Sequence, residues 1–337
     1  MIQQVLLCIA CACTIGCTDA LPTDAVPNPW QAAPPMPEAR LEGVVVAAGG
    51  RLWYLGGITG TFGDQTSARA SDRVDVFDPA TGNWSAGPPL PDGAARHHLA
   101  VAAIGAQIWV LGGFTGIIGG ADVAGKFTPN AQTWLLEDGK WQRKADQPVA
   151  RGAATAQALG GRIYVVGGGP HEAEAVRDVW AYDPATDTWQ QRAWLPTERQ
   201  HLASCALGGK LLAVGGWLSP AKQAVDAAQL YDPQSDTWAL LPDLPTARGG
   251  LGAATLTIDG LERCHVVGGE RWHEPLPATF AAHEAFDLTS GTWQKLPPMP
   301  TRRHGLGVAT LAGRLWTVGG GPVLGNSYTA AVETFAP

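Results

Sequence analysis

Charged residues are scarce in this sequence, and it contains no cluster of basic residues. Lys, Arg, Asp and Glu make up 16% of the 337 residues, and the formal net charge is -7 at pH 7. A protein that binds a nucleic-acid backbone needs a basic surface that neutralises phosphates and releases their counterions. We therefore expect no nucleic-acid partner.

Long stretches of good helix formers are also missing, whereas 43 residues are glycine and 26 are proline. Glycine and proline weaken the interiors of helices and strands and are typical of turns. This composition favours an all-β protein with many short strands, and the chain is long enough for an ample core.

The apolar run near the N-terminus is too short to span a bilayer. It extends from Val5 to Cys17, whereas a membrane helix needs about 20 apolar residues. Such a run predicts a signal peptide over residues 1–20, and hence export to the periplasm, the outer membrane or cell envelope, or the extracellular space. Its end, "IGC", resembles the end of a bacterial lipobox, which makes Cys17 a candidate for lipidation and a membrane tether.

Cysteine is rare in the rest of the chain. Four of the six cysteines lie in the first 20 residues, which leaves Cys205 and Cys264. Two cysteines in a body of this size do not make a disulfide framework, so we expect two buried thiols. Between the signal and the body, residues 21–29 are Pro-rich without periodicity and predict a disordered or extended tether.

A repeat of about 50 residues organises the body of the chain. A Gly-Gly doublet ends an apolar run six times, at intervals of 48 to 56 residues. The doublets begin at Gly56, Gly112, Gly167, Gly215, Gly268 and Gly319. In five repeats an arginine follows a tryptophan by ten residues, and Trp84 and Arg96 form a sixth pair that is two residues longer.

These doublets and Trp/Arg pairs resemble the kelch β-propeller family, in which each repeat is a four-stranded blade. The resemblance covers residues 30–337 and implies an all-β, six-bladed propeller. Residues 97–104, "HHLAVAAI", are almost continuously apolar and predict an innermost strand buried on both faces. Residues 179–189, "VWAYDPATDTW", predict a third strand followed by a hairpin into the outer strand. Each doublet predicts a place where a neighbouring backbone comes so close that a Cβ would clash.

The two ends of the body are expected to share one blade. The last segment, "AAVETFAP", has the pattern of a third strand with no tryptophan after it, and the missing outer strand is found at residues 30–39. Pairing of these segments would complete the sixth blade and close the ring.

One face of the disc is the predicted binding face. In an up-and-down blade, the connection between the second and third strands and the connection into the next blade lie on the same face. There the loops are long and unlike one another, at residues 57–71, 114–130 and 270–284, whereas the opposite turns are short. We call it the long-loop face, and we expect function there because variable loops on rigid elements carry binding residues.

The arginine of the Trp/Arg pair recurs in all six repeats. The six are Arg40, Arg96, Arg151, Arg199, Arg248 and Arg303. Because every blade has this residue, we expect a structural role, bonded to loop carbonyls or to a carboxylate at the blade junction. The alternative is a ring of cations that attracts an anionic ligand to the channel mouth.

The two positions after each recurring arginine vary, and we call them the first and second mouth positions. The first holds Leu41, His97, Gly152, Gln200, Gly249 or His304, and the second holds Glu42, His98, Ala153, His201, Gly250 or Gly305. The resemblance implies that such positions contribute to ligand binding. Arg302, which precedes the last recurring arginine, joins Glu42, His97, His98, His201 and His304 as a candidate ligand-binding residue. The alternative is that the histidines are neutral, hydrogen-bonded fillers of the upper channel.

Imidazoles and a carboxylate at equivalent positions also suit zinc or non-haem iron. No local HxxxH or HxH spacing is present, so a metal site would depend wholly on convergence of distant residues, and we assign no metal and no cofactor. A copper-radical site of the galactose-oxidase kind is not expected, because the tyrosines fall in second and third strands and Cys205 in an inner strand. His265 occupies a second-strand place that is aromatic in other repeats, and we expect it in the core.

The loop after the fifth doublet, "GERWHEP" at residues 269–275, is chemically the densest on this face. An aromatic ring beside acidic and basic groups suits a sugar, which stacks on the ring while the charged groups bind hydroxyls or transfer protons. Trp272 and His273 are therefore candidate ligand-binding residues. The candidates for catalysis are Glu270, Arg271, His98 and His201. The alternative is an ordinary solvated loop.

Varied loops without a recognised catalytic set favour an exported binding module for a protein or a carbohydrate, which we expect to be a monomer. The alternative is a carbohydrate-active enzyme of the mutarotase or epimerase type that uses acid/base residues on the same face. Bacterial sialic-acid mutarotases are exported six-bladed kelch propellers, and Glu270, directly after a doublet, is similar to their pattern. A third hypothesis is a purely structural component of an envelope assembly.

Overall fold

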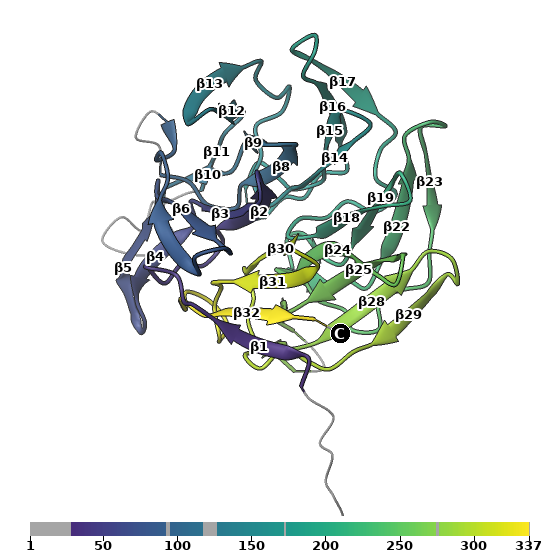
Figure 1. Cartoon of the computed structure of the whole chain (residues 1–337). Coiled ribbons are helices and arrows are strands. Elements are labelled where there is room, and N and C mark those ends of the chain that lie inside the picture. The colour runs from purple at the N-terminus through teal and green to yellow at the C-terminus, as the bar shows by residue number, and fades with distance from the viewer. Residues whose placement is uncertain (1–27, 92–94, 117–126, 172, 274–275, 337) are drawn as a thin grey trace, which may run out of the picture.

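The strands form a ring of blades around a central axis (Figure 1). The computed structural model describes residues 28–91, 95–116, 127–171, 173–273 and 276–336. Within this part there are six four-stranded antiparallel sheets, which confirms the predicted all-β, six-bladed propeller. The predicted signal peptide, most of the tether and Cys17 lie outside the described residues. The described part contains no helix that is long and apolar enough to cross a membrane.

The first three blades each use four strands in chain order. Blade one consists of β2 (Val44–Ala48), β3 (Arg51–Leu55), β6 (Val74–Asp78) and β7 (Asn83–Ala86). Blade two consists of β8 (Ala100–Ile104), β9 (Gln107–Leu111), β12 (Thr133–Glu137) and β13 (Lys140–Lys144). Blade three consists of β14 (Thr155–Leu159), β15 (Arg162–Val166), β16 (Val179–Asp183) and β17 (Thr188–Arg192).

The last three blades lead back to the start of the ring. Blade four consists of β18 (Ala203–Leu207), β19 (Lys210–Val214), β22 (Ala228–Asp232) and β23 (Thr237–Leu240). Blade five consists of β24 (Gly252–Ile258), β25 (Leu261–Val267), β28 (His283–Asp287) and β29 (Thr292–Lys295). Blade six consists of β30 (Gly307–Leu311), β31 (Arg314–Val318), β32 (Val332–Phe335) and β1 (Trp30–Ala33).

The N-terminal strand closes the ring. β1 pairs antiparallel with β32, from Trp30 opposite Phe335 to Ala33 opposite Val332. Figure 1 shows the purple β1 beside the yellow β32 at the rim of the last blade. The predicted completion of the sixth blade by the N-terminal segment is confirmed.

Each Gly-Gly doublet follows the second strand of its blade at a point of close backbone approach. A Cβ on Gly167 would lie 2.6 Å from the carbonyl oxygen of Arg199 in the next blade, and one on Gly319 would lie 2.8 Å from that of Arg40. In all six blades a Cβ on the first glycine would lie within 2.8 Å of the next recurring arginine's carbonyl oxygen. The predicted reason for the doublets is therefore confirmed.

The innermost strands do not bury both faces, contrary to the prediction from their apolar runs. Residues of β8 alternate between buried and half-buried, because one face packs within the blades and the other lines the axial channel. A cavity of about 150 Å³ in this channel is lined by residues of all six inner strands. β8 also begins at Ala100 rather than at His97, since the positive φ of 54° at His98 interrupts the extended backbone.

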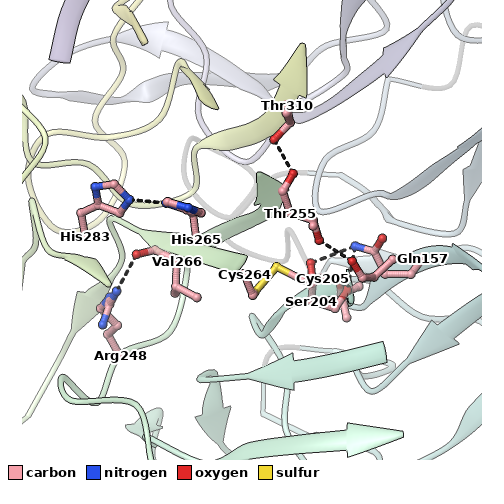
Figure 2. The surroundings of a disulfide bond; sticks show 12 residues. Gln157, Ser204, Cys205, Arg248, Thr255, Cys264, His265, Val266, His283 and Thr310 are labelled. Carbon is pink, nitrogen blue, oxygen red and sulfur yellow. Dashed lines mark hydrogen bonds between the residues drawn. A yellow bond between two sulfur atoms is a disulfide. The ribbon is translucent and has the colours of Figure 1, made fainter. Parts of the chain in front are cut away.

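Hydrogen bonds tie the inner strands together around the channel. Thr310 Oγ1 donates to the carbonyl oxygen of Thr255 at 2.7 Å, and Gln157 Nε2 donates to that of Ser204 at 2.8 Å (Figure 2). These bonds cross from blade six to blade five and from blade three to blade four. They satisfy polar side chains in a narrow channel whose other lining residues are mostly Val, Ala, Leu and Gly.

A disulfide joins blades four and five (Figure 2). Cys205 in β18 and Cys264 in β25 are 59 residues apart in the sequence, and their Cα atoms lie 5.7 Å apart. Both residues are fully buried. The prediction of two buried thiols is therefore wrong, because the ring places the inner strand of one blade against the second strand of the next.

The long connections on the long-loop face fold into small hairpins in four blades. The paired strands are β4 (Ile58–Thr61) with β5 (Asp64–Ala70), β10 (Phe114–Thr115) with β11 (Thr128–Pro129), β20 (Trp217–Leu218) with β21 (Gln223–Ala224), and β26 (Glu270–Arg271) with β27 (Ala278–Thr279). The residue after each doublet also bridges to the first mouth position of its own blade, as Ile58 does to Leu41. The connection between the second and third strands and the connection into each inner strand therefore lie on the same face, as predicted.

Candidate functional site

The second mouth positions form a closed ring of backbone hydrogen bonds around the axis. Each N–H donates to the carbonyl oxygen of the second mouth position in the preceding blade, at 2.8 to 3.0 Å. All six residues have a φ between 54° and 60°, a conformation that costs a residue other than glycine about 1–2 kcal/mol. Four of them nevertheless carry a side chain, and the ring holds those of Glu42, His98 and His201 at the mouth of the channel.

Glu42, His98 and His201 converge, although they come from blades one, two and four. One carboxylate oxygen and one nitrogen of each imidazole all lie within 4.8 Å of one another. His98 Nε2 lies 3.3 Å from Glu42 Oε2, and the rings of His98 and His201 meet edge to face with centroids 4.8 Å apart. The three residues also line a cavity of about 100 Å³ at the mouth. The structure therefore supplies the convergence that spacing in the sequence did not indicate.

His97 is fully buried next to His98 and orients its ring. His97 Nε2 lies 3.0 Å from the carbonyl oxygen of Gly116, which can only accept, so the hydrogen of this bond is on Nε2. The two Nδ1 atoms of His97 and His98 are within hydrogen-bonding distance of each other. The rings of Phe114 and Phe127 pack against both histidines.

The ring of Trp217 orients the ring of His201. The two rings are stacked, with centroids 4.1 Å apart. His201 is 7% exposed, and its Nδ1 is buried without a hydrogen-bond partner among the described residues. Trp217 follows the fourth doublet directly, so the repeat register could have identified it as a site residue, but sequence reasoning missed it.

Glu270 and His304 form a second buried pair at the mouth. Glu270 is 2% exposed, and its Oε2 lies 3.5 Å from His304 Nε2. His304 Nδ1 lies 3.0 Å from the carbonyl oxygen of Gly321, so it carries the hydrogen of that bond. A Cβ on Gly250 would lie 3.5 Å from Glu270 Oε1, so the carboxylate lies next to the second mouth position of blade five.

Burial lowers the pKa of all four mouth histidines. The pKa falls to about 4 for His97 and to about 4 for His304. For His98 and His201 burial holds the pKa well below its usual value, and the positive charge of Lys222 acts in the same direction. Because an unperturbed imidazole titrates near pH 6.5, all four rings are neutral at pH 7.

The blade-five candidates Trp272 and His273 do not line the mouth cavity. Trp272 is half-buried, with Lys222 Nζ 5.1 Å from its ring centre. His273 is exposed and bonds through Nε2 to the carbonyl oxygen of Ala221 in the neighbouring hairpin. Glu274 lies outside the described residues. Sequence reasoning missed Lys222, because it lies in an irregular hairpin that the repeat register does not align.

The two remaining arginine candidates do not join the cluster. Arg271 Nε donates to the carbonyl oxygen of Leu276 at 3.2 Å, and its guanidinium lies over the Phe280 ring, 5.3 Å from the centroid. Arg302 is exposed. The structure therefore separates both from the acidic and imidazole groups at the axis.

The recurring arginines are structural, as predicted. All six are at most 1% exposed. Arg303 Nη1 donates to the carbonyl oxygens of Gly319 and Ala331, each at 2.9 Å, and Nη2 donates to Glu333 Oε2 at 2.7 Å. Arg40, Arg151, Arg199 and Arg248 bond in the same way to the first doublet carbonyl of their own blades. The alternative of a cationic ring at the mouth is contradicted by this burial.

Comparison with known proteins agrees with the fold. The profile of the KLHDC2/KLHL20/DRC7 Kelch-repeats domain matches residues 42–269. Kelch-like protein terF of Aspergillus terreus is 26% identical over 310 residues, which are 91% of this chain and 55% of that protein. Beta-scruin of Limulus polyphemus is 36% identical over 84 residues, 25% of this chain and 9% of that protein. The chain thus spans about half or less of the length of these curated relatives.

A solved structure titled "Structure of YjhT" is similar over most of the chain. The superposition has a TM-score of 0.70 and covers 89% of this chain and 96% of the other, with 16% sequence identity. At this identity the likeness establishes the shared fold alone.

Proposed function

We propose that this chain, which belongs to the kelch-repeat family, is a binding module that holds a carbohydrate at the mouth of its channel on the long-loop face. The observation that carries the proposal is the convergence of Glu42, His98 and His201 beside a cavity of about 100 Å³. A carboxylate accepts hydrogen bonds from sugar hydroxyls, and a neutral imidazole either donates or accepts. Trp272 adds a half-buried aromatic face on which a sugar ring can stack.

Binding of defined sugars tests this proposal. A glycan array would select the ligand, and calorimetry would compare the wild type with Glu42→Gln and Trp272→Ala. We expect at least a tenfold loss of affinity in each variant, since each removes one recognition group. His171→Ala is the matched control, because His171 is an exposed histidine next to a carboxylate on another blade. Capture of a protein segment with unchanged affinity in Glu42→Gln, or no binding of any glycan, would contradict the proposal.

A carbohydrate-active enzyme is the second candidate function, and the Glu270/His304 pair favours it. A carboxylate 3.5 Å from an imidazole can pass a proton to or from a sugar hydroxyl that reaches it. Catalysis of anomer exchange or epimerisation would appear as accelerated interconversion in NMR spectra. Glu270→Gln should abolish the acceleration and leave the fold intact. Normal turnover in that variant would reject the assignment of Glu270.

Export and lipidation at Cys17 remain part of the proposal. The buried Cys205–Cys264 disulfide supports export, because disulfides persist in oxidising compartments. Fractionation of a bacterial host that expresses the full chain should place the protein in the envelope. Cys17→Ser should release it from the membrane fraction if the tether is a lipid, and cytoplasmic recovery of the wild type would contradict export.

A monomer is the proposed state in solution. Strands of a single chain complete the ring, which supports it. Light scattering on the eluting protein should give a mass close to 35.2 kDa for the whole chain. A mass of twice this value would contradict the proposal.

A further inference from the structure

We infer that Glu42, His98 and His201 form a binding site for a divalent transition-metal ion, with zinc the best match to the donor set. This inference goes beyond carbohydrate binding and stands whether or not a sugar is the ligand. Two imidazoles and one carboxylate are a common zinc donor set that leaves a coordination position open. The remaining position would face the mouth of the channel, where the three residues line a cavity of about 100 Å³.

The donor atoms are close enough together to coordinate a single zinc ion. Zinc bonds to imidazole nitrogen and carboxylate oxygen are about 2.0–2.2 Å long, which places two tetrahedral ligands about 3.4 Å apart. His98 Nε2 and Glu42 Oε2 are 3.3 Å apart. The full set lies within 4.8 Å, so the His201 side of the site would close by at most about 1.5 Å on binding.

The hydrogen bonds behind His98 prepare its ring for coordination. The bond to Gly116 places the hydrogen of His97 on Nε2, and in the neutral ring this leaves a lone pair on Nδ1. His98 Nδ1 must then donate to His97 Nδ1. Its own lone pair is consequently on Nε2, the atom that faces Glu42 Oε2. Metal-binding histidines are usually held in this way, with the second nitrogen donating to a group behind the ring.

His98 Nε2 and Glu42 Oε2 face each other at 3.3 Å. A divalent cation between them would be coordinated by both atoms together. His201 gives an independent indication, since it is 7% exposed and its Nδ1 has no hydrogen-bond partner among the described residues. Stacking on Trp217 restricts the rotation of this ring.

The charges around the mouth also permit a cation. Two carboxylates, Glu42 and Glu270, lie at the mouth, and one ammonium, Lys222, opposes a cation from the blade-four hairpin. The two carboxylates outnumber the single ammonium among these three groups. The backbone ring adds rigidity, because Glu42, His98 and His201 share a φ of 54° to 55° and are joined to neighbouring blades by hydrogen bonds.

Titration of the full-length, chelator-treated protein with zinc chloride tests the inference. We expect saturable binding of one ion per chain by calorimetry, a rise in the thermal midpoint, and a visible absorption band of a four- or five-coordinate site when cobalt(II) replaces zinc. His98→Ala and His201→Ala should each weaken zinc binding by roughly 100-fold or more, because loss of a direct ligand exceeds the 10–100-fold effect of losing an outer partner. Alanine fits these positions, since Ala153 occupies the equivalent place with a φ of 54°.

The controls separate coordination from folding. His171→Ala removes an exposed histidine that lies 3.2 Å from Glu174 and should leave zinc affinity unchanged. His97→Phe should lower zinc affinity about 10–100-fold and change the cobalt spectrum while the thermal midpoint without metal is retained, as expected for a positioning residue.

Either of two results would overturn the inference. One is the absence of saturable zinc or cobalt binding to the wild type. The other is binding that persists in the His98→Ala/His201→Ala double variant. Neither result depends on a sugar, so failure of the carbohydrate proposal and failure of the metal site are distinguishable.

Discussion

A buried guanidinium occupies the same place in every blade, but its side-chain partner changes from blade to blade. The partner is a carboxylate of Asp75, Asp178, Glu284 or Glu333, or an amide of Gln132 or Gln229. The backbone partner is more regular, since five of the arginines bond to the first carbonyl of their doublet. The recurring arginine is therefore best understood as a donor to backbone carbonyls, with its counter-ion chosen separately in each blade.

Arg303→Met should lower the free energy of unfolding by about 3–5 kcal/mol, because it leaves Glu333 buried without its cation and removes the side-chain donor from the carbonyl oxygens of Gly319 and Ala331. Chemical denaturation at neutral pH measures this. Arg302→Met is the matched control: Arg302 is adjacent and exposed, and its loss should change stability by less than about 0.5 kcal/mol. The double variant Arg303→Met/Glu333→Gln should recover part of the loss. Equal losses in the single and double variants would contradict the role of the buried charge.

For single residues, the sequence predicted the position in the repeat better than the contacts in space. Register alone identified the arginines and placed Glu42, His98 and His201 at equivalent positions, because each blade repeats the same local geometry. Register does not give the diameter of the ring, and the approach of His98 to Glu42 at 3.3 Å depends on it. The disulfide was missed for the same reason, since only the packing of adjacent blades brings Cys205 and Cys264 together.

β1 has only four residues, but the segment that contains it makes contacts with three blades. Trp30 is 4% exposed, its Nε1 donates to the carbonyl oxygen of Pro297 at 2.8 Å, and its ring packs against His283 and Phe335. Met36, just after the strand, is also 4% exposed and joins the core between blades six and one. The segment therefore connects blades five, six and one as well as covering the edge of β32.

Deletion of residues 30–39 should lower the thermal midpoint by at least about 10 °C, because it exposes the edge of β32 and opens two inter-blade cores. Trp30→Ala should cost about 3–5 kcal/mol in denaturant unfolding. Trp194→Ala serves as its control, since Trp194 is 48% exposed and should contribute less than about 1 kcal/mol. An unchanged midpoint after the deletion would show that the ring does not depend on this strand.

The order of the strands could be predicted from the sequence. The burial of the inner strands and the presence of the small hairpins could not. Doublets and Asp-Pro turns mark strand ends through local backbone chemistry, and the second and third strands lie where these signals place them. The apolar inner strands were expected to be buried on both faces, but small side chains such as those of Ala102 and Val101 also suit a narrow channel. The hairpins on the long-loop face were read as loops, because two-residue strands such as Phe114–Thr115 carry no detectable alternation.

For the whole molecule, the disulfide is a covalent bond between two adjacent blades. Reduction should lower the free energy of unfolding by about 4 kcal/mol, the chain-entropy value for cross-linked residues 59 positions apart. Equilibrium denaturation with and without a phosphine reductant measures the effect. Cys205→Ala/Cys264→Ala should be insensitive to the reductant, which provides the control. A wild-type midpoint that does not move under reducing conditions would contradict a stabilising disulfide.

Buried neutral histidines give the molecule a dependence on pH that is separate from the mouth. His265 Nδ1 lies 2.9 Å from His283 Nε2 in blade five (Figure 2). Burial lowers the pKa of His265 to about 4, helped by the charge of Arg263, and that of His283 to about 3, helped by the charges of His265 and Arg248. In the unfolded chain both titrate near 6.5. Between these values the unfolded state binds protons that the folded state excludes.

Stability should therefore be greatest above pH 6.5, fall as the pH drops towards 4, and lose no more through these two groups below about pH 3. At pH 5 each histidine should account for about 2 kcal/mol of the loss. His265→Trp/His283→Val, which installs the residues found at these places in blades one and six, removes both titrations. We expect this variant to lose about 4 kcal/mol less than the wild type between pH 7.5 and pH 5 in denaturant unfolding. The same loss in both proteins would show that the pair does not set the acid sensitivity of the fold.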